Sequence, residues 1–268
     1  MEFLKTHEEA TYEFVECFSA EDRKTDSGIN HRVLVDQEDI QSFVDFITPI
    51  VKEHQISKND FDNRKKLIEK LKIQKLESTV PSPYPQNTST QKGNFAEIFL
   101  AEYLEETTDT SLPIYRLRYN PNVEQSMKGD DVLMFDLDAE PVRIIVGESK
   151  FRTTPQKKDV IDITDGLIRA NKAKVPISLM FVAYILRKEN KEELAQKVEE
   201  CTVLFALNKV EVDYVGMLMS SRNAKNTIDR HTTSELRNML MISVGMLSPQ
   251  ELVASVYQSL EDEYDCFN

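Results

Sequence analysis

The chain has few of the residues that build disulfide-stabilised or zinc-binding domains. Its three cysteines, Cys17, Cys201 and Cys266, are far apart and form no CxxC pair. Neither a disulfide framework nor a zinc knuckle is therefore indicated. The four histidines are equally scattered, and no two of them have the spacing of metal ligands.

Long apolar segments and common nucleotide-binding motifs are also missing. No apolar run approaches the roughly 20 residues that are needed to span a bilayer. The first residues carry Glu2, Glu8 and Glu9, where a signal peptide would be basic and then apolar. The motifs GxxxxGK[ST], GxGxxG and GxSxG do not occur. We therefore expect a cytoplasmic protein with no membrane segment and no nucleotide cofactor of its own.

The composition is that of an ordinary globular protein with a strong excess of acidic residues. The chain has 268 residues, of which 40% are hydrophobic and 29% charged, enough for one large domain or two small ones. Its net charge of −13 argues against a protein that coats nucleic acid by charge alone. An enzyme that approaches phosphate through bound cations is compatible with this charge, but it would need a partner to supply affinity for DNA.

A proline-rich segment divides the chain. Residues 79–92 (TVPSPYPQNTSTQK) place three prolines among serine, threonine and asparagine, which is typical of a linker. We therefore predict an N-terminal accessory region at residues 1–85 and a main domain at residues 86–268. The accessory region is the candidate for contact with a partner.

The accessory region is expected to contain strands and helices. Short apolar runs favour strands at residues 11–18 and 31–35. Residues 36–55 carry the stripe of an amphipathic helix, which Asp36 is expected to cap and Pro49 to kink or shorten. A strongly basic helix is expected near residues 60–77; its cations form either a solvated face or a surface for phosphate or a partner.

The main domain is expected to alternate helices and strands. The predicted elements are a helix at 93–106, strands at 112–120, 130–138 and 141–151, a helix at 154–174, a strand at 209–221 and a mainly helical remainder. Residues 176–200 begin with an apolar run that fits a buried strand or a buried helix, and the charged residues that follow it favour a helix. Ala139 and Glu140 are nearly the whole connection between two of these strands, which predicts a tight hairpin. This order predicts an α/β fold with a mixed sheet flanked by helices.

Three charged residues stand at one end of the predicted hairpin. Asp131 begins its first strand, and Glu148 and Lys150 end its second strand, separated by Ser149. Residues i and i+2 of a strand point to the same face. Glu148 and Lys150 therefore project together, and the hairpin can place Asp131 beside them.

This trio has the chemistry of a metal-dependent phosphodiesterase. Two carboxylates at one point repel each other unless a cation lies between them. Carboxylates with open water positions suit Mg²⁺ or Mn²⁺, which would polarise a phosphate and lower the pKa of a bound water. Lys150 is placed to orient that water or to stabilise the charge that develops on the phosphate.

The D…ExK pattern on consecutive strands resembles the PD-(D/E)XK, or restriction-endonuclease-like, nuclease superfamily. Gly129 precedes Asp131 by two residues, as in the common G-x-D form. Glu97, in GNFAE on the preceding helix, stands where many members carry an additional metal-supporting glutamate. Asp130 replaces the proline of the family name, which is a common departure. The resemblance implies a restriction-endonuclease-like core with an N-terminal accessory region and a helical C-terminus.

Two assignments within this resemblance have alternatives. Asp130 competes with Asp131 for the metal position, and we prefer Asp131 because it immediately precedes the apolar run VLMF. Arg152, Lys157 and Lys158 lie near the start of the helix after the motif, where members often hold a residue that contacts phosphate. The other interpretation of these cations is a solubilising surface.

The resemblance can be narrowed to one family. The runs GNFAEIFLAEYL, GDDVLMF, IIVGESKFR and DITDGLIRA are similar to those of the HamA family, once defined only as a domain of unknown function. HamA is the nuclease subunit of the Hachiman antiphage defence system. The resemblance implies a bacterial protein that works with a helicase partner, HamB, and cuts DNA.

Two other functions compete with this interpretation. The chain could keep a nuclease-like fold and only regulate a partner, although the intact Asp131, Glu148 and Lys150 argue against this. It could also be a sequence-specific restriction endonuclease that acts as a homodimer, which would require an evident target-recognition segment. Measuring cleavage with and without Mg²⁺ distinguishes a nuclease from a regulatory module. Comparing the cleavage of unrelated DNA sequences distinguishes a non-specific nuclease from a restriction endonuclease.

Overall fold

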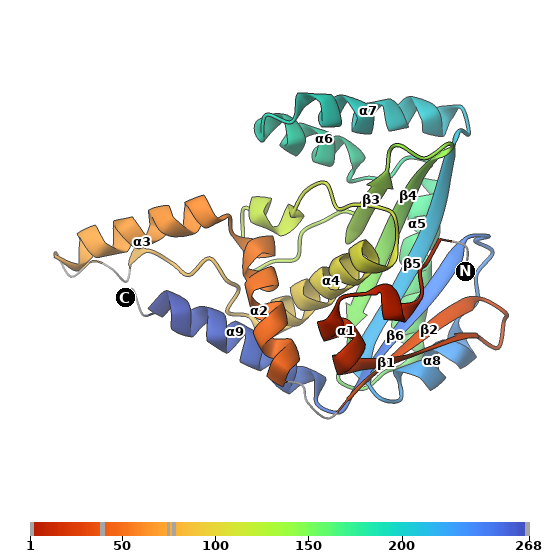
Figure 1. Cartoon of the computed structure of the whole chain (residues 1–268), viewed down its shortest axis with the longest axis horizontal. Helices are drawn as coiled ribbons and strands as arrows, with labels where there is room; N and C mark the ends of the chain where they lie inside the picture. Colours follow the sequence, from red (N-terminus) through yellow and green to blue (C-terminus); the bar gives the residue numbers. More distant parts are fainter. Residues whose placement is uncertain (1–2, 38–40, 74–75, 77–78, 266–268) are drawn as a thin grey trace.

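A single mixed sheet organises the chain. The computed structural model describes residues 3–37, 41–73, 76 and 79–265, and these residues build one six-stranded sheet of order β1-β2-β6-β5-β4-β3 (Figure 1). The strands are β1 (Phe18–Lys24), β2 (Asn30–Asp36), β3 (Val132–Asp136), β4 (Val142–Phe151), β5 (Val210–Ser221) and β6 (Met239–Met246).

The four inner strands run parallel, and the two edge strands run against them. β4 pairs with β5, β5 with β6 and β6 with β2 in parallel, whereas β3 and β1 are antiparallel to their neighbours. β6 is buried at every position, as expected of a parallel strand that is covered on both faces. The predicted α/β fold with a mixed sheet is confirmed.

Helices cover both faces of the sheet and enclose two hydrophobic cores. The helices of the first core are α1 (Tyr12–Cys17), α2 (Gln41–Gln55), α4 (Thr88–Thr107) and α9 (Pro249–Asp265), with α3 (Lys58–Lys72) extending away from the sheet (Figure 1). The helices of the second core are α5 (Lys157–Lys172), α6 (Leu179–Lys188), α7 (Glu192–Ala206) and α8 (Ala224–His231). Two short 3₁₀ helices, η1 (His7–Glu9) and η3 (Arg116–Tyr119), complete the assignment.

The alternation of β4 divides its side chains between the two cores. Ile145 and Phe151 pack in the first core with α4, whereas Ile144 and Val146 pack in the second core with α5. The site described below lies where this strand ends, between the two helices that cover its opposite faces.

Two N-terminal predictions need correction. Residues 11–18 form α1 and the first residue of β1 rather than a strand, and the buried Phe14 and Cys17 have the spacing of a helix face. Asp36 does not cap α2. It ends β2, where its carboxylate accepts hydrogen bonds from Arg222 Nε at 2.9 Å and from the backbone N–H of Leu247 at 2.6 Å.

Of the remaining N-terminal predictions, the strand and the two helices are confirmed. The strand predicted at residues 31–35 is confirmed as β2. α2 contains Pro49 and continues to Gln55, so the proline does not shorten it. The basic helix is confirmed as α3, although Lys75 lies outside the described residues.

Two strand assignments in the main domain were wrong. The segment at 112–120 forms η3 instead of a strand, and only Ser111 before it bridges to Phe135 of β3. β6 lies in the part that was expected to be mainly helical, because a short, continuously apolar run fits a buried strand or a buried helix equally well. The hairpin of β3 and β4, strand β5 and the C-terminal helix α9 are confirmed. The helical interpretation of residues 176–200 is also confirmed, although two helices, α6 and α7, stand there and α7 continues to Ala206.

The predicted boundary at residue 85 does not divide the sheet. β2 pairs with β6, so the N-terminal strands of region 1–85 extend the sheet of region 86–268. Side chains from Leu4 to Tyr264 share the first core. Contact of region 1–85 with a partner stays a prediction. Among the described residues, no helix combines the length and apolar character that a membrane crossing requires.

Candidate active site at the end of the β3–β4 hairpin

Asp131 lies against the end of β4. Val132 pairs with Gly147 in the hairpin register, which places the preceding residue, Asp131, opposite Glu148. Asp131 Oδ2 accepts hydrogen bonds from the backbone N–H of Ser149 at 2.9 Å and from Ser149 Oγ at 3.2 Å. The structure thus brings together the two carboxylates that the strand pattern placed side by side.

Lys150 is paired with Glu148. Its Nζ donates a hydrogen bond to Glu148 Oε1 at 2.7 Å, and the side chains of Glu148 and Lys150 are 18% and 28% exposed. Burial raises the pKa of Glu148, the negative charge of Asp131 raises it further, and the Lys150 ammonium opposes both. The charges of Asp131 and Lys150 therefore both act on the ionisation of Glu148.

Glu97 reaches the same region from α4, but Arg116 holds it. Glu97 is buried, and its carboxylate accepts hydrogen bonds from Arg116 Nε at 2.6 Å and Nη2 at 3.3 Å. Burial raises the pKa of Glu97 to about 8; Arg116 opposes this shift, and the charges of Asp131 and Glu148 add to it. The field of the two carboxylates therefore extends to Glu97.

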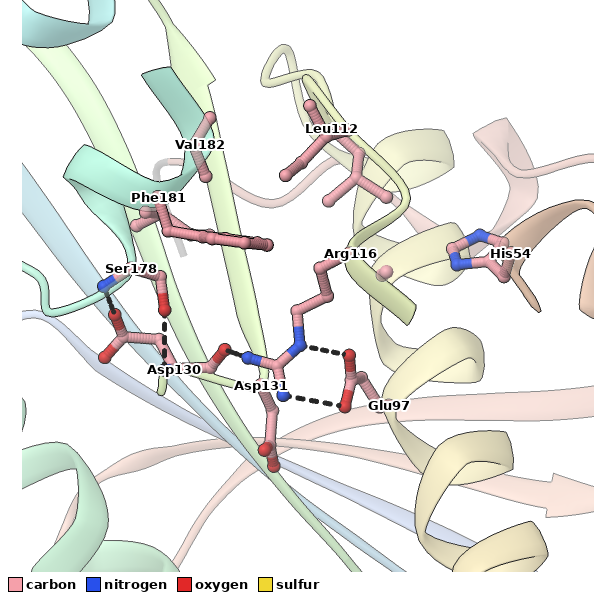
Figure 2. A pocket seen from close by; sticks show the side chains of 12 residues that line it. His54, Glu97, Leu112, Arg116, Asp130, Asp131, Ser178, Phe181 and Val182 are labelled. Carbon is pink, nitrogen blue, oxygen red and sulfur yellow. Dashed lines mark hydrogen bonds and ion pairs between the residues drawn. The ribbon is translucent and has the colours of Figure 1, made fainter. Parts of the chain in front are cut away.

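Arg116 also fixes the segment that leads into Asp131. It donates to the backbone carbonyl of Met127 at 3.1 Å and to that of Asp130. Figure 2 shows its guanidinium between Glu97 and the segment that carries Asp130 and Asp131. Sequence reasoning missed Arg116, because it placed this residue in a strand; the only signal was a charged residue within an apolar run.

Asp130 points away from this cluster. Its Oδ2 accepts a hydrogen bond from the backbone N–H of Ser178 at 3.0 Å, and its own N–H donates to Ser178 Oγ at 2.9 Å. Ser178 precedes the first turn of α6. Gly129 permits this close approach, because a Cβ there would lie 2.5 Å from Ser178 Oγ. These contacts favour Asp131 over Asp130 as the metal ligand.

The predicted phosphate-contacting residues lie around the start of α5. Arg152 Nε is paired with Asp159 Oδ1 at 2.7 Å, and Asp159 also accepts from the backbone N–H of Gln156. Lys157 and Lys158 are exposed on the first turn of α5. Their contact with phosphate stays a prediction.

A cavity of about 280 Å³ lies where α4 begins and β4 ends. Four predicted site residues line it: Glu97, Asp131, Lys150 and Arg152. The pocket of Figure 2, which Arg116 crosses, has a volume of about 20 Å³ and holds little more than one water molecule. The larger cavity is therefore the candidate substrate site.

The comparison with known proteins agrees with the sequence motifs. Residues 9–260 match the family described as HamA. The chain belongs to the HamA family. The Hachiman protein HamA of Bacillus cereus is 36% identical over 180 residues, which are 66% of this chain and 64% of that relative. The HamA match starts before β1 and includes the candidate site, so the N-terminal strands belong to the family's shared region.

The donor set of this HamA-family chain fits a hard divalent cation. Within the described ranges, no three or more His, Cys, Asp or Glu side chains converge closely enough to hold a metal by themselves. Mg²⁺, however, is commonly held by one or two carboxylates together with water and substrate phosphate. Asp131 and Glu148 supply two such carboxylates, and their repulsion is what a cation would relieve. As a direct ligand, Glu97 would first have to leave Arg116.

Gly166 shapes the space that Glu148 occupies. It lies on α5, and a Cβ at this position would be 2.9 Å from Cδ and 3.0 Å from Oε2 of Glu148. Real Cβ atoms do not approach other atoms this closely, so any larger residue would displace the carboxylate. The glycine of the DITDGL run is therefore part of the geometry of the site.

Proposed function

We propose that this HamA-family chain is a metal-dependent DNA nuclease and the nuclease subunit of a Hachiman antiphage defence complex. The observation that carries the proposal is the convergence of Asp131, Glu148 and Lys150 at the end of one hairpin, beside an open cavity. The order α4, β3, β4, α5, β5, with these residues at the end of the hairpin, supports a restriction-endonuclease-like core.

In the proposed mechanism, Asp131 and Glu148 would hold Mg²⁺ or Mn²⁺. A divalent cation bound there would polarise the scissile phosphate and lower the pKa of a bound water. Lys150, with its Nζ 2.7 Å from Glu148 Oε1, positions the attacking water and stabilises the developing negative charge. Glu97 supports the site from α4, where Arg116 fixes it together with the segment before Asp131.

A helicase partner, similar to HamB, would raise the affinity for DNA, which the net charge of −13 weakens. α3 supports such a contact, because it extends away from the sheet (Figure 1). Leu67 is 47% exposed on α3, and Ile73 beyond its last turn is 86% exposed. We place the contact with the partner on this helix.

The test is cleavage of plasmid and linear DNA by the full chain, alone and with its helicase partner, in Mg²⁺ and in EDTA. We expect cleavage that requires the metal and that proceeds on DNA of unrelated sequences. Cutting confined to one sequence would indicate a restriction endonuclease instead. Absence of cleavage under every metal and partner condition would overturn the proposal in favour of a regulatory module.

Gly166→Ala is expected to lower the cleavage rate by about 100-fold, because displacement of a catalytic group by about 1 Å can have an effect of this size. The fold should persist, since alanine favours a helix over glycine by about 1 kcal/mol. Cleavage rate and melting temperature are measured together. Lys172→Ala, at the exposed end of the same helix, is the control. If the Gly166→Ala variant cleaves DNA at the wild-type rate, the present position of Glu148 is not required for cleavage.

A further inference from the structure

We propose that the first two turns of α4 bind the phosphate backbone of the DNA strand that enters the cavity, through Lys92 and Asn94 and across the open surface at Gly93. The inference rests on the proposed nuclease function and identifies where its substrate is held. None of these three residues was selected from the sequence as a contact with nucleic acid.

The placement of these residues follows from helix geometry. Ser89, Lys92, Gly93 and Glu97 are spaced by three, one and four residues, so they form one stripe along α4. All four line the cavity that also contains Lys150. The stripe therefore connects the acidic end of the cavity, where Asp131 and Glu97 lie, with a basic end.

Lys92 is the cation of this cavity that is available to a phosphate. Lys150 is paired with Glu148, and Arg152 is paired with Asp159. Lys92 makes no ion pair with any described residue; its Nζ lies 5.6 Å from the centroid of the Phe151 ring, which directly follows Lys150. Lys92 is a half-buried residue beside the end of β4. Its ammonium group, which has no carboxylate partner among the described residues, suits a phosphate oxygen.

Asn94 contributes an independent observation. The residue is only 7% exposed and lines the cavity. Its side-chain amide makes no hydrogen bond to any residue in the described part of the chain. Buried polar groups are nearly always hydrogen-bonded, so this amide is expected to find its partner in solvent or in a ligand. A phosphodiester oxygen accepts such a bond.

Gly93 leaves the wall of the cavity open. A Cβ at this position would meet no atom within 4 Å, and the residue is exposed. Glycine at such a point lets a ligand approach the helix backbone closely. Elsewhere the chain is strongly acidic, so a local basic surface beside the cleavage residues is where a polyanion can be held.

The experiment compares Gly93→Glu with Gly93→Gln, which differ in charge and hardly in shape. Both are made in the full-length chain that carries Glu148→Gln, and binding of a fluorescein-labelled single-stranded oligonucleotide is measured with Ca²⁺ present. We expect Gly93→Glu to bind about tenfold or more weakly than Gly93→Gln, because a new carboxylate repels the strand. Lys92→Ala should reduce the slope of log affinity against log salt by about one, and Lys92→Arg should restore it.

Lys209→Ala is the control, because this exposed lysine precedes β5 at the opposite end of the sheet. Equal binding by the two Gly93 variants, or no binding of the oligonucleotide to the parent chain, would overturn the inference. Inorganic phosphate should compete no better than sodium chloride of equal ionic strength; stronger competition would show a site for a free anion instead. Failure of the nuclease proposal is seen separately, as wild-type protein that does not cleave.

Discussion

Lys150→Met is expected to lower the rate of DNA cleavage by about 10²–10³-fold, the effect of removing one group that stabilises transition-state charge. Methionine keeps the apolar stem of the side chain and removes only the ammonium group, which lies 2.7 Å from Glu148 Oε1. The loss should therefore appear in kcat measured at saturating DNA, and the melting temperature should change little.

The control for Lys150 is Lys209→Met, which removes an exposed ammonium group at the other end of the sheet. This variant should cleave DNA at the wild-type rate. A loss in Lys150→Met that is confined to KM would contradict the assigned role, because it would show that Lys150 binds DNA without acting on the chemical step.

Arg116→Ala is expected to reduce the free energy of unfolding by about 3–5 kcal/mol at pH 9, because breaking a buried pair leaves an uncompensated charge. The side chains of Arg116 and Glu97 are 12% and 11% exposed, so solvent screens the pair weakly. The substitution also removes the donor to the carbonyls of Met127 and Asp130. Chemical denaturation followed by circular dichroism measures this loss.

The pH dependence is an internal control for the same pair. The pKa of Glu97 is raised from its ordinary value of 4.5 to about 8 in the folded chain, so folding favours the protonated carboxyl group. Its contribution to stability is fully present below pH 4.5 and is lost as pH rises to about 8. The effect of Arg116→Ala should therefore be smaller at pH 5 than at pH 9, and Glu97→Gln should remove that difference. An equal loss at both pH values would contradict the account of the pair.

The candidate trio could be predicted because its geometry is local. Strands β3 and β4 are short apolar runs joined by a tight turn, so alternation and register are enough to place Asp131 opposite Glu148 and to put Lys150 on the same face. The same reasoning predicted the mixed sheet. These features depend on the alternation of apolar residues and on elements that are close together along the chain, and both can be read from the sequence.

Features that depend on distant contacts could not be predicted in this way. Arg116 turns inward to reach Glu97, and this geometry replaces the strand that the apolar pattern of its segment favoured. β2 joins the sheet through β6, about two hundred residues further along the chain, and no local pattern specifies that pairing. The sequence already favoured Asp131 over Asp130, but the contact of Asp130 with Ser178 at the start of α6 could not be predicted.

The measurement that tests the central claim most directly is cleavage of supercoiled plasmid in Mg²⁺ by wild type, Glu148→Gln and Asp130→Asn. The claim is that Asp131 and Glu148 hold the metal on which the phosphate is cut, while Asp130 only anchors α6. We expect wild type and Asp130→Asn to cut the plasmid and Glu148→Gln to leave it intact. Cutting by Glu148→Gln at the wild-type rate would contradict the account.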